Sequence, residues 1–329
     1  MRLDPLADRL RSELKGRVDT DLGLARFTTY RLGGPAALFV EPAGTEDLEA
    51  LGGVLRDEGL AGDELPVLAL GRGSNLLVAD TGFPGLVVRM GSGFSWIRPW
   101  DPNAPASGAG DPSGLAAGAA TSQPQVANWA ARRGLAGFEW AIAIPGSIGG
   151  AVRMNAGAHD GSMSECLADA TIWNMATFEM EERTRDELGF GYRYSSLGPR
   201  DLVVAARLAL TPDDPATIRK CLDDHRRHRA ETQPGALQNA GSTFKNPPGD
   251  SAGRLVEAAG LKGFRVGGAS VSQIHANFFV ATDSATAQDV HDLVGAVRSR
   301  VKERFGVDLE PEVRFIGDFS ARAGSAGAA

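Results

Sequence analysis

The sequence of 329 residues has only two cysteines, no excess of basic residues and no long apolar run. Cys166 and Cys221 lie far apart and belong to no CxxC or Cys/His cluster, which argues against a zinc site or a disulfide framework and fits a reducing cytoplasm. A net charge of −7 and a pI near 5.4 argue against a nucleic acid or an anionic membrane as partner, because binding to either depends on a basic surface. No stretch approaches the roughly 18 consecutive apolar residues of a membrane span, and residues 1–17 lack the apolar segment of a signal peptide. We therefore expect a cytoplasmic protein that binds neither nucleic acid nor membrane.

The chain does contain enough apolar sequence for two or three compact domains. Hydrophobic residues make up 43% of its positions, an ordinary value for a folded protein. The residues from Pro99 to Gly114 are rich in Pro, Gly, Ser and Asp and predict a surface loop. The small residues from Phe319 to Ala329 predict a disordered tail. We assign no function to either segment.

The most informative feature is a glycine-rich, uncharged stretch from Ile144 to Ala151, followed closely by Asn155-Ala156-Gly157-Ala158. Small residues leave main-chain amides exposed, and successive amides form concave nests that bind phosphate oxygens. The stretch therefore predicts a phosphorylated cofactor that lies against main chain.

A second glycine loop, Gly71 to Asn75, stands between the apolar runs 67–70 and 76–78, an order that predicts strand, turn and strand. A Rossmann fingerprint needs a third glycine and a following helix. Leu76 occupies the position of that glycine, and Gly82-Phe83-Pro84-Gly85 would interrupt a helix. This loop therefore argues against an NAD-type Rossmann site.

Hydrophobic periodicity indicates α+β organisation along the whole chain. We expect a helix capped by Thr45 that ends at Gly59, a helix capped by Thr121 or Ser122 with Val126, Trp129 and Ala130 inward, and a charged helix over 216–230. A short helix should end at Gly260, and a long final helix should bury Val290, Leu293, Val294, Val297, Val301 and Phe305. The expected strands include 38–40, 67–70, 86–88, 170–173, 202–205 and 277–280.

Four further segments carry more polar chemistry than folding requires. They are Gly191-Tyr192-Arg193-Tyr194-Ser195, Gly241-Ser242-Thr243-Phe244-Lys245-Asn246-Pro247, Leu261-Lys262-Gly263 and Leu309-Glu310-Pro311-Glu312-Val313-Arg314. Together with the two glycine loops, their order closely resembles the bacterial UDP-N-acetylenolpyruvoylglucosamine reductases, flavoenzymes that complete UDP-N-acetylmuramic acid in peptidoglycan synthesis. The resemblance runs from about Thr28 to Gly317, and six motifs recur in one order.

The resemblance implies an α+β fold with FAD-binding subdomains of the PCMH or vanillyl-alcohol-oxidase type. The expected division is an FAD-binding subdomain over 1–90, a second one over 91–213, a substrate-binding domain over 214–318 and the tail at 319–329. It also implies non-covalently bound FAD. The implied FAD contacts are Gly71, Gly73, Ser74, Asn75, Pro145, Gly146, Ser147, Gly150, Asn155, Gly157 and Ala158.

By the same resemblance, NADPH reduces the flavin, which then reduces the terminal carbon of an enolpyruvyl ether. An enolate-like intermediate needs a fixed cation, a proton donor and exclusion of water. The resemblance assigns the carboxylate-binding cation to Arg193, the proton donor to Ser242 and the acidic partner to Glu312, and it places Asn246 and Lys262 at the UDP part of the substrate.

Two features limit the resemblance, and two other functions stay open. His159 stands where many relatives have Tyr, and the chain lacks the additional tyrosine-bearing loop, so it resembles the shorter branch of the family. The alternatives are an FAD oxidase of the same fold and a non-catalytic sugar-nucleotide binding protein. The expected partner is a small-molecule sugar nucleotide, no metal is expected, and the protein is expected to be a monomer.

Overall fold

The computed structural model describes residues 3–62, 64–101, 113–235 and 237–319. Its contacts divide the chain into two compact units. Unit 1 comprises Met1–Leu22, Ala37–Ser74 and Gly85–Gly235, and unit 2 comprises Gly23–Ala36, Asn75–Pro84 and Ala236–Ala329. Each unit has its own hydrophobic core. The division into three domains with boundaries after residues 90 and 213 stays a prediction.

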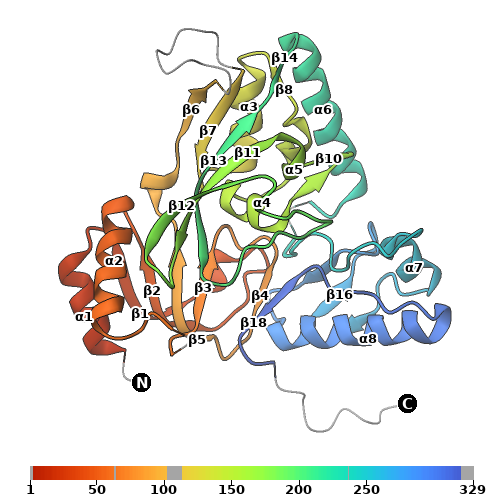
Figure 1. Ribbon diagram of the computed structural model, residues 1–329. Coiled ribbons are helices and arrows are strands. Elements are labelled where there is room, and N and C mark those ends of the chain that lie inside the picture. Colours follow the sequence, from red (N-terminus) through yellow and green to blue (C-terminus); the bar gives the residue numbers. More distant parts are fainter. Residues whose placement is uncertain (1–2, 63, 102–112, 236, 320–329) are drawn as a thin grey trace. The chain divides into compact units, whose positions relative to one another are not determined.

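The N-terminal layer of unit 1 is a four-stranded sheet covered by two helices. Figure 1 shows the helices side by side against the sheet, and their apolar faces share one core with it. The strand order is β1-β2-β5-β3, with β3 parallel to β5. The elements are α1 (Asp4–Glu13), β1 (Arg17–Gly23), β2 (Pro35–Glu41), α2 (Thr45–Asp57), β3 (Val67–Leu70) and β5 (Phe83–Arg89).

The second layer of unit 1 is a five-stranded antiparallel sheet in the order β12-β11-β13-β7-β6. Its strands are β6 (Ile97–Trp100), β7 (Gly114–Gly118), β11 (Leu167–Asn174), β12 (Glu179–Thr184) and β13 (Asp201–Ala209). Helix α4 packs on β13 and β7, while α3 and α6 pack on the 3-10 helix η3. The helices of this layer are α3 (Gln123–Ala131), η3 (Glu139–Ala143), α4 (Ile148–Met154), α5 (Met163–Cys166) and α6 (Pro215–Thr232). Two short antiparallel pairs complete it. They are β8 (Leu135–Ala136) with β14 (Thr211–Pro212), and β9 (Gly157–Ala158) with β10 (Gly161–Ser162).

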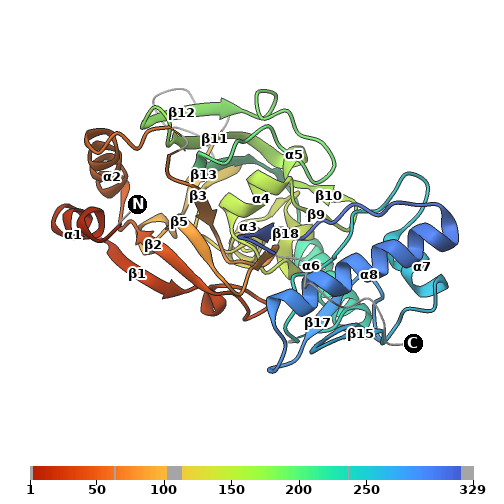
Figure 2. The same ribbon diagram turned by 90° about the horizontal axis from the view of Figure 1, so that it is seen from below.

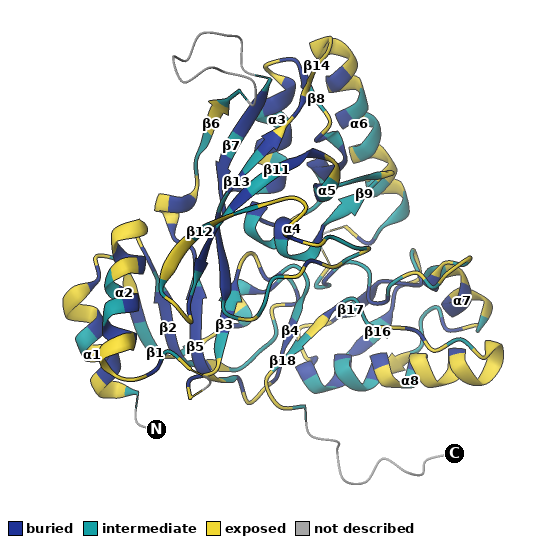
Figure 3. Cartoon of the chain, viewed as in Figure 1, coloured by how far each residue is buried: buried dark blue, intermediate teal, exposed yellow. Residues whose placement is uncertain are grey.

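Unit 2 packs the helix α8 on a small antiparallel sheet, as Figure 2 shows from below. Figure 3 shows the resulting alternation along α8 between a buried face and an exposed face. The sheet order is β15-β16-β17, and a separate parallel pair joins β4 to β18. The elements of unit 2 include β4 (Leu76–Val78), α7 (Ala252–Ala258), β15 (Arg265–Val266), β16 (Ala269–Val271), β17 (Phe279–Ala281), α8 (Ala287–Phe305) and β18 (Arg314–Ile316). The 3-10 helix η1 (Ala25–Phe27) lies in unit 2, and η2 (Ser92–Phe94) lies in unit 1.

The structure corrects three details of the expected elements. Gly44, not Thr45, is the N-cap of α2, and Thr45 is its first helical residue. Trp129 packs against the core as expected but is only partly buried, and Phe305 is 37% exposed because α8 ends there and Gly306 turns the chain. Both irregular segments were also predicted too long: residues 99–100 belong to β6 and Gly114 to β7, and the Phe319 ring stacks on His291 with ring centres 4.8 Å apart. The remainder of the loop expected over 99–114 and of the tail expected over 319–329 lies largely outside the described residues. No helix in the described residues is long and apolar enough to cross a membrane.

Candidate functional site

The two glycine loops of the sequence lie against each other within unit 1. Arg72 Nε donates a hydrogen bond to the Pro145 carbonyl at 3.1 Å. A Cβ atom added at Gly71 would lie 2.7 Å from the Ser147 hydroxyl, so no larger residue fits there without movement of Ser147. Gly73 has φ +60°, a conformation that favours glycine. Loops that stand more than 70 positions apart in the sequence therefore form one continuous surface.

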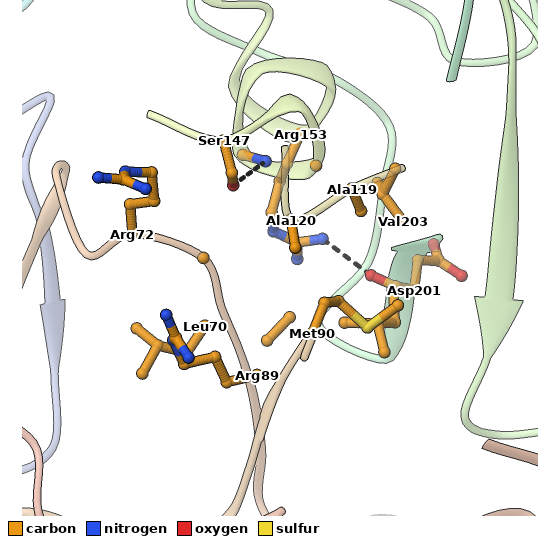
Figure 4. Close-up of a pocket in the computed structure, with 15 residues that line it drawn as sticks. Leu70, Arg72, Arg89, Met90, Ala119, Ala120, Ser147, Arg153, Asp201 and Val203 are labelled. Carbon is orange, nitrogen blue, oxygen red and sulfur yellow. Dashed lines mark hydrogen bonds between the residues drawn. The ribbon is translucent and has the colours of Figure 1, made fainter. Parts of the chain in front are cut away.

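A pocket with about 580 Å³ of empty space opens at this surface (Figure 4). Gly71, Ser147 and Gly150, all expected FAD contacts, line it. The sequence reasoning missed its other lining residues, which are Ala69, Leu70, Arg72, Arg89, Met90, Ala119, Ala120, Gly149, Arg153, Asp201, Leu202 and Val203.

The expectation that the Ile144–Ala151 stretch offers a row of bare amides is only partly correct. Ile148 and Gly149 donate their amides to the carbonyls of Thr121 and Ala119, at 2.9 and 3.0 Å. The Gly150 amide donates to the Ser147 hydroxyl at 3.4 Å. These bonds fix the start of α4 against the segment before α3. Amides that donate to no described residue are found instead at Arg72, Ser74 and Gly146.

The charged side chains that line the pocket are mostly cationic. Asp201 is neutralised by Arg183, which donates to both carboxylate oxygens at 3.0 and 3.1 Å. Arg153 binds the carbonyls of Asp201 and Gly198, and Figure 4 shows the first of these bonds. Arg72 is exposed and forms no ion pair with a described residue. Arg89 forms an ion pair with Glu41, so it is the exposed Arg72 and the open amides that fit an anionic group such as a diphosphate.

Arg193 sits at the tip of a tight turn in unit 1. The turn is closed by hydrogen bonds between the main chains of Gly191 and Tyr194, at 3.1 and 3.2 Å. Arg193 has φ +54°, and one Nη donates to the Gly157 carbonyl at 2.6 Å. Its guanidinium carbon also lies 5.2 Å from the centre of the Tyr192 ring. Arg193, Gly157 and the turn thus form one local cluster.

The β9–β10 hairpin next to this cluster explains the position of His159. Ala158 pairs with Gly161, and the two connecting residues His159 and Asp160 have φ +50° and +62°, as a type I′ turn requires. The His159 ring stacks on His225 of α6, with ring centres 4.0 Å apart. Burial and the nearby His225 lower the pKa of His159 below its usual value.

In unit 2 the segments that carry Ser242 and Glu312 run side by side. Phe244 pairs with Pro311 in an antiparallel bridge, and the Glu312 amide donates to the Thr243 carbonyl at 2.8 Å. The side chain of Asn75 donates to the Glu312 carbonyl at 3.1 Å. Two of the three expected catalytic residues therefore lie on paired segments of unit 2, while Arg193 belongs to unit 1.

Asn277, which sequence reasoning did not single out, fixes the Ser242 segment. It is only 3% exposed, and its carboxamide both accepts from the Phe244 amide at 3.0 Å and donates to the Phe244 carbonyl at 2.8 Å. The Thr243 amide donates to the Asn277 carbonyl at 2.8 Å. The Ser242 hydroxyl itself makes no hydrogen bond to a described residue, so it is available to a ligand.

The two expected UDP contacts have partners in the protein. Lys262 Nζ pairs with Glu257 at 2.7 Å, and Asn246 Oδ1 accepts from the Ala252 amide at 3.0 Å at the start of α7. His275 lies near Lys262, and burial, together with that positive charge, lowers the pKa of His275. The roles of Asn246 and Lys262 stay predictions.

Comparison with known proteins first defines the class. Residues 36–177 match the family model described as FAD binding domain, and the α+β fold is of the PCMH type. Residues 233–316 match the model described as UDP-N-acetylenolpyruvoylglucosamine reductase, C-terminal domain.

Full-length relatives then give the family. The chain is 47% identical over 320 residues to UDP-N-acetylenolpyruvoylglucosamine reductase 2 of Symbiobacterium thermophilum, covering 96% of this chain and 98% of the relative. It is 41% identical to the corresponding reductase of Geobacter sulfurreducens, over 96% of this chain and 99% of that protein. The crystal structure of the Thermus caldophilus reductase matches with a TM-score of 0.75 and 36% identity, over 92% of this chain and all of that one. The chain belongs to the UDP-N-acetylenolpyruvoylglucosamine reductase family, as the sequence motifs indicated.

Proposed function

We propose that this protein is an NADPH-dependent, FAD-containing reductase that converts the enolpyruvyl ether of UDP-N-acetylglucosamine to UDP-N-acetylmuramate in peptidoglycan synthesis. The observation that carries the proposal is the 47% identity to a reductase of this name over nearly the full length of both chains. The pocket at the glycine loops supports it, because an enzyme of this class needs a site for a dinucleotide flavin.

The pocket residues fit FAD. Arg72 supplies a cation without an acidic partner among the described residues, and the amides of Arg72, Ser74 and Gly146 can donate to diphosphate oxygens. Bound there, FAD would accept a hydride from NADPH and pass it to the enolpyruvyl group. We propose that the loops at Gly71–Asn75 and Pro145–Gly150 hold it. Asn155 and Gly157, which follow α4, bond to the turn that carries Arg193, and Ala158 stays a predicted FAD contact.

We propose that Arg193 binds the carboxylate of the enolpyruvyl group. A guanidinium can donate two parallel hydrogen bonds to a carboxylate, which an ammonium group cannot imitate. As the hydride reaches the terminal carbon, negative charge develops on the adjacent carbon and on this carboxylate. A fixed cation stabilises that charge more than it stabilises the neutral double bond, and the difference lowers the barrier.

We propose that Ser242 protonates the carbon that becomes negative, with Glu312 as the acidic partner. The Ser242 hydroxyl makes no hydrogen bond to a described residue. Glu312 lies on the segment that pairs with the Ser242 segment through the bridge between Phe244 and Pro311. An unactivated hydroxyl is a weak acid, but the carbanion-like carbon is a strong base, so orientation matters more than acidity. General acid catalysis of this kind contributes about 10²–10⁴-fold.

The UDP part of the substrate is proposed to reach Asn246 and Lys262. Lys262 would have to exchange its bond to Glu257, or share it, when the diphosphate arrives. An exposed ion pair of this type stabilises the protein by roughly 0–1 kcal/mol, so loss of the Lys262–Glu257 bond costs little free energy.

An anaerobic spectrum recorded in two steps tests the function. The purified protein should be yellow, lose its absorbance with NADPH, and regain it when the enolpyruvyl sugar nucleotide is added. A flavin that stays oxidised with NADPH, or that stays reduced after addition of the substrate, contradicts the proposal. A flavin that regains colour as fast with oxygen as with the substrate would favour the oxidase alternative instead.

Replacement of the proton donor separates the two half-reactions. Ser242→Ala should leave flavin reduction by NADPH unchanged and slow reoxidation by the substrate by about 10²–10⁴-fold. The control is Ser284→Ala, because Ser284 is exposed and its hydroxyl bonds only to Thr282. Equal loss in both half-reactions would show that Ser242 has a structural role.

We also propose non-covalent flavin, a monomeric state and a cytoplasmic location. The loop from Gly71 to Asn75 contains neither His nor Cys, the residues that usually tether a flavin in oxidases of this fold. Denaturation should therefore release free FAD. The proposed location rests on the low cysteine content of the sequence, which is typical of proteins in a reducing compartment.

A further inference from the structure

We propose that the side chain of Asn155 acts on the reaction through Arg193, as a positioning residue, rather than as a direct contact to the flavin. The inference deepens the proposed function and rests on it, because it concerns the residue that binds the substrate carboxylate. It is carried by a set of hydrogen bonds that lies entirely within unit 1.

Both the nitrogen and the oxygen of the Asn155 carboxamide are bonded to the protein. Asn155 is 7% exposed, its Nδ2 donates to the Gly191 carbonyl at 2.9 Å, and its Oδ1 accepts from the Ser164 amide at 2.9 Å. Its backbone has φ +41° and ends α4 in the left-handed conformation that Asn adopts more readily than most residues. The side chain therefore points into the protein, toward the turn that carries Arg193.

The turn needs this support because its own conformation is unfavourable. Arg193 has φ +54°, a region that a non-glycine residue adopts only when its surroundings hold it there. Three hydrogen bonds, one at every second residue from Gly191 to Ser195, keep the turn in this conformation. They are Asn155 Nδ2 to the Gly191 carbonyl, the Ser195 hydroxyl to the Arg153 carbonyl at 2.7 Å, and Arg193 Nη to the Gly157 carbonyl at 2.6 Å.

The same short helix also lines the pocket. Ser147, Gly149, Gly150 and Arg153 of the α4 region line the pocket, and Asn155 follows the last turn. The α4 region thus lines the proposed flavin site with residues from its N-cap Ser147 to Arg153, and its C-cap Asn155 bonds to the Arg193 turn. The α4 region therefore links the lining of the pocket to the turn that carries the guanidinium.

Two substitutions separate the side chain from the backbone conformation. Asn155→Gly keeps the positive φ available but removes both side-chain bonds. Asn155→Asp keeps the acceptor for the Ser164 amide and replaces the donor toward Gly191 by an oxygen that repels its carbonyl. The matched control is Asn174→Gly, because Asn174 Oδ1 also accepts main-chain amides in unit 1, at Ala176 and Thr177, and its Nδ2 donates to Glu181, but it lies outside the pocket and the turn.

The holoenzyme variants are compared in three measurements: bound FAD per chain, the rate of flavin reduction by NADPH, and the rate of reoxidation by the enolpyruvyl substrate. Positioning through Arg193 predicts unchanged FAD content and flavin reduction, with reoxidation slowed about 10–100-fold by a displacement of the guanidinium. Combined with Arg193→Lys, Asn155→Asp should add little further loss. Loss of FAD in proportion to activity, or a fully additive double variant, overturns the proposal.

Hydrogen exchange gives a readout that does not depend on the reaction. The amides of Gly191 and Tyr194 should exchange faster in both Asn155 variants than in the wild type, and Asn174→Gly should leave them unchanged. Unchanged exchange in Asn155→Gly overturns the positioning role. If the wild type itself fails the two-step flavin test, the proposed function is wrong, whereas this exchange result still decides whether Asn155 holds the turn.

Discussion

At the scale of single residues, Asn277 holds the Ser242 segment in place by hydrogen bonds that the sequence did not reveal. Its carboxamide imitates a neighbouring strand for Phe244, whose ring is 1% exposed. Removal of that carboxamide leaves a buried amide and a buried carbonyl without partners, and each such group costs about 1–3 kcal/mol.

Asn277→Leu should therefore lower the free energy of unfolding by about 2–4 kcal/mol, measured by urea denaturation. Gln273→Leu is the control, because Gln273 is exposed and should change stability by no more than about 0.5 kcal/mol. Equal effects of the two substitutions would mean that water or a shifted main chain replaces the lost partners.

His275 makes a prediction about pH. Burial first, and the charge of Lys262 second, lower the pKa of His275, and its Nδ1 accepts from the Asn277 amide at 3.2 Å only while it is unprotonated. The unfolded chain therefore binds a proton below about pH 6.5, before the folded chain does. Stability contributed by this group is present above that pH and is lost as the pH falls from there through the folded-state pKa.

NMR titration of the histidine ring carbons should show a midpoint for His275 below about 6.5, with assignment by the His275→Gln variant. His159 should titrate low as well, since burial and His225 lower its pKa. A midpoint for His275 above that value would show that a negative partner, such as Glu257, dominates its surroundings.

At the scale of elements, α8 depends on a carboxylate from a distant segment. Asp80 accepts from the amides of Ala287 and Gln288, at 2.9 and 3.1 Å, in the first turn of the helix. Thr286 and Asp289 form a capping box at the same end. Asp80 thus binds the segment after β4 to the largest helix of unit 2, and its negative charge suits the helix N-terminus.

Asp80→Ala should lower the free energy of unfolding by about 0.5–2 kcal/mol, the usual effect of the loss of a helix cap. The control Asp318→Ala removes an exposed carboxylate that binds no described residue and should have little effect. Thermal unfolding followed by circular dichroism measures both. If the two variants unfold alike, the capping box alone stabilises the helix start.

The sequence predicted elements with a strong local pattern better than those defined by distant partners. The order of strand, glycine loop and strand at 67–78 is confirmed, and so are α2, α6 and α8 apart from their ends. Helix α1 and β1 were not predicted, because charges alternate with short apolar steps there. The parallel pairing of β4 with β18 could not be predicted, since no local pattern relates segments so far apart.

The residues of the candidate site, too, could be predicted from the sequence only where a local pattern marks them. The glycine loops could be found because small residues and turns leave a sequence pattern, but the choice of Ser242 and Glu312 came from the family resemblance alone. Arg72, Arg89 and Arg153 were missed because an arginine in a sequence is most often a surface charge. The amides of Ile148 and Gly149 were expected to be bare because sequence does not show the carbonyls of Thr121 and Ala119 that bind them.

At the scale of the whole molecule, unit 2 is assembled from three separate parts of the chain. Its core contains Tyr30 and Leu77, which are 1% and 0% exposed, from the two short segments, and the Tyr30 hydroxyl donates to the Phe279 carbonyl at 3.1 Å. A fragment of residues 236–319 lacks both side chains as well as the strand β4 that pairs with β18.

That fragment should not fold by itself. Each missing apolar side chain removes about 1.5–3 kcal/mol of burial, which is a large share of the stability of a small domain. Its proton NMR spectrum should show the narrow dispersion of an unfolded chain, whereas the intact protein serves as the folded reference. A well-dispersed spectrum of the fragment would show that the two short segments are not needed for the core of unit 2.

Removal of FAD provides a test of where the cofactor binds. A ligand that binds only the folded state stabilises it by about 2.7 kcal/mol when present at 100 times its dissociation constant. Because the pocket lies in unit 1, the gain in hydrogen-exchange protection on adding FAD to the apoprotein should concentrate in the loops 71–74 and 145–150. Asn75 belongs to unit 2, so protection of residues 75–84 would separately support its predicted contact with FAD. Protection that is absent from both glycine loops would contradict the proposed flavin site, because loops that hold the cofactor cannot open as freely with it as without it.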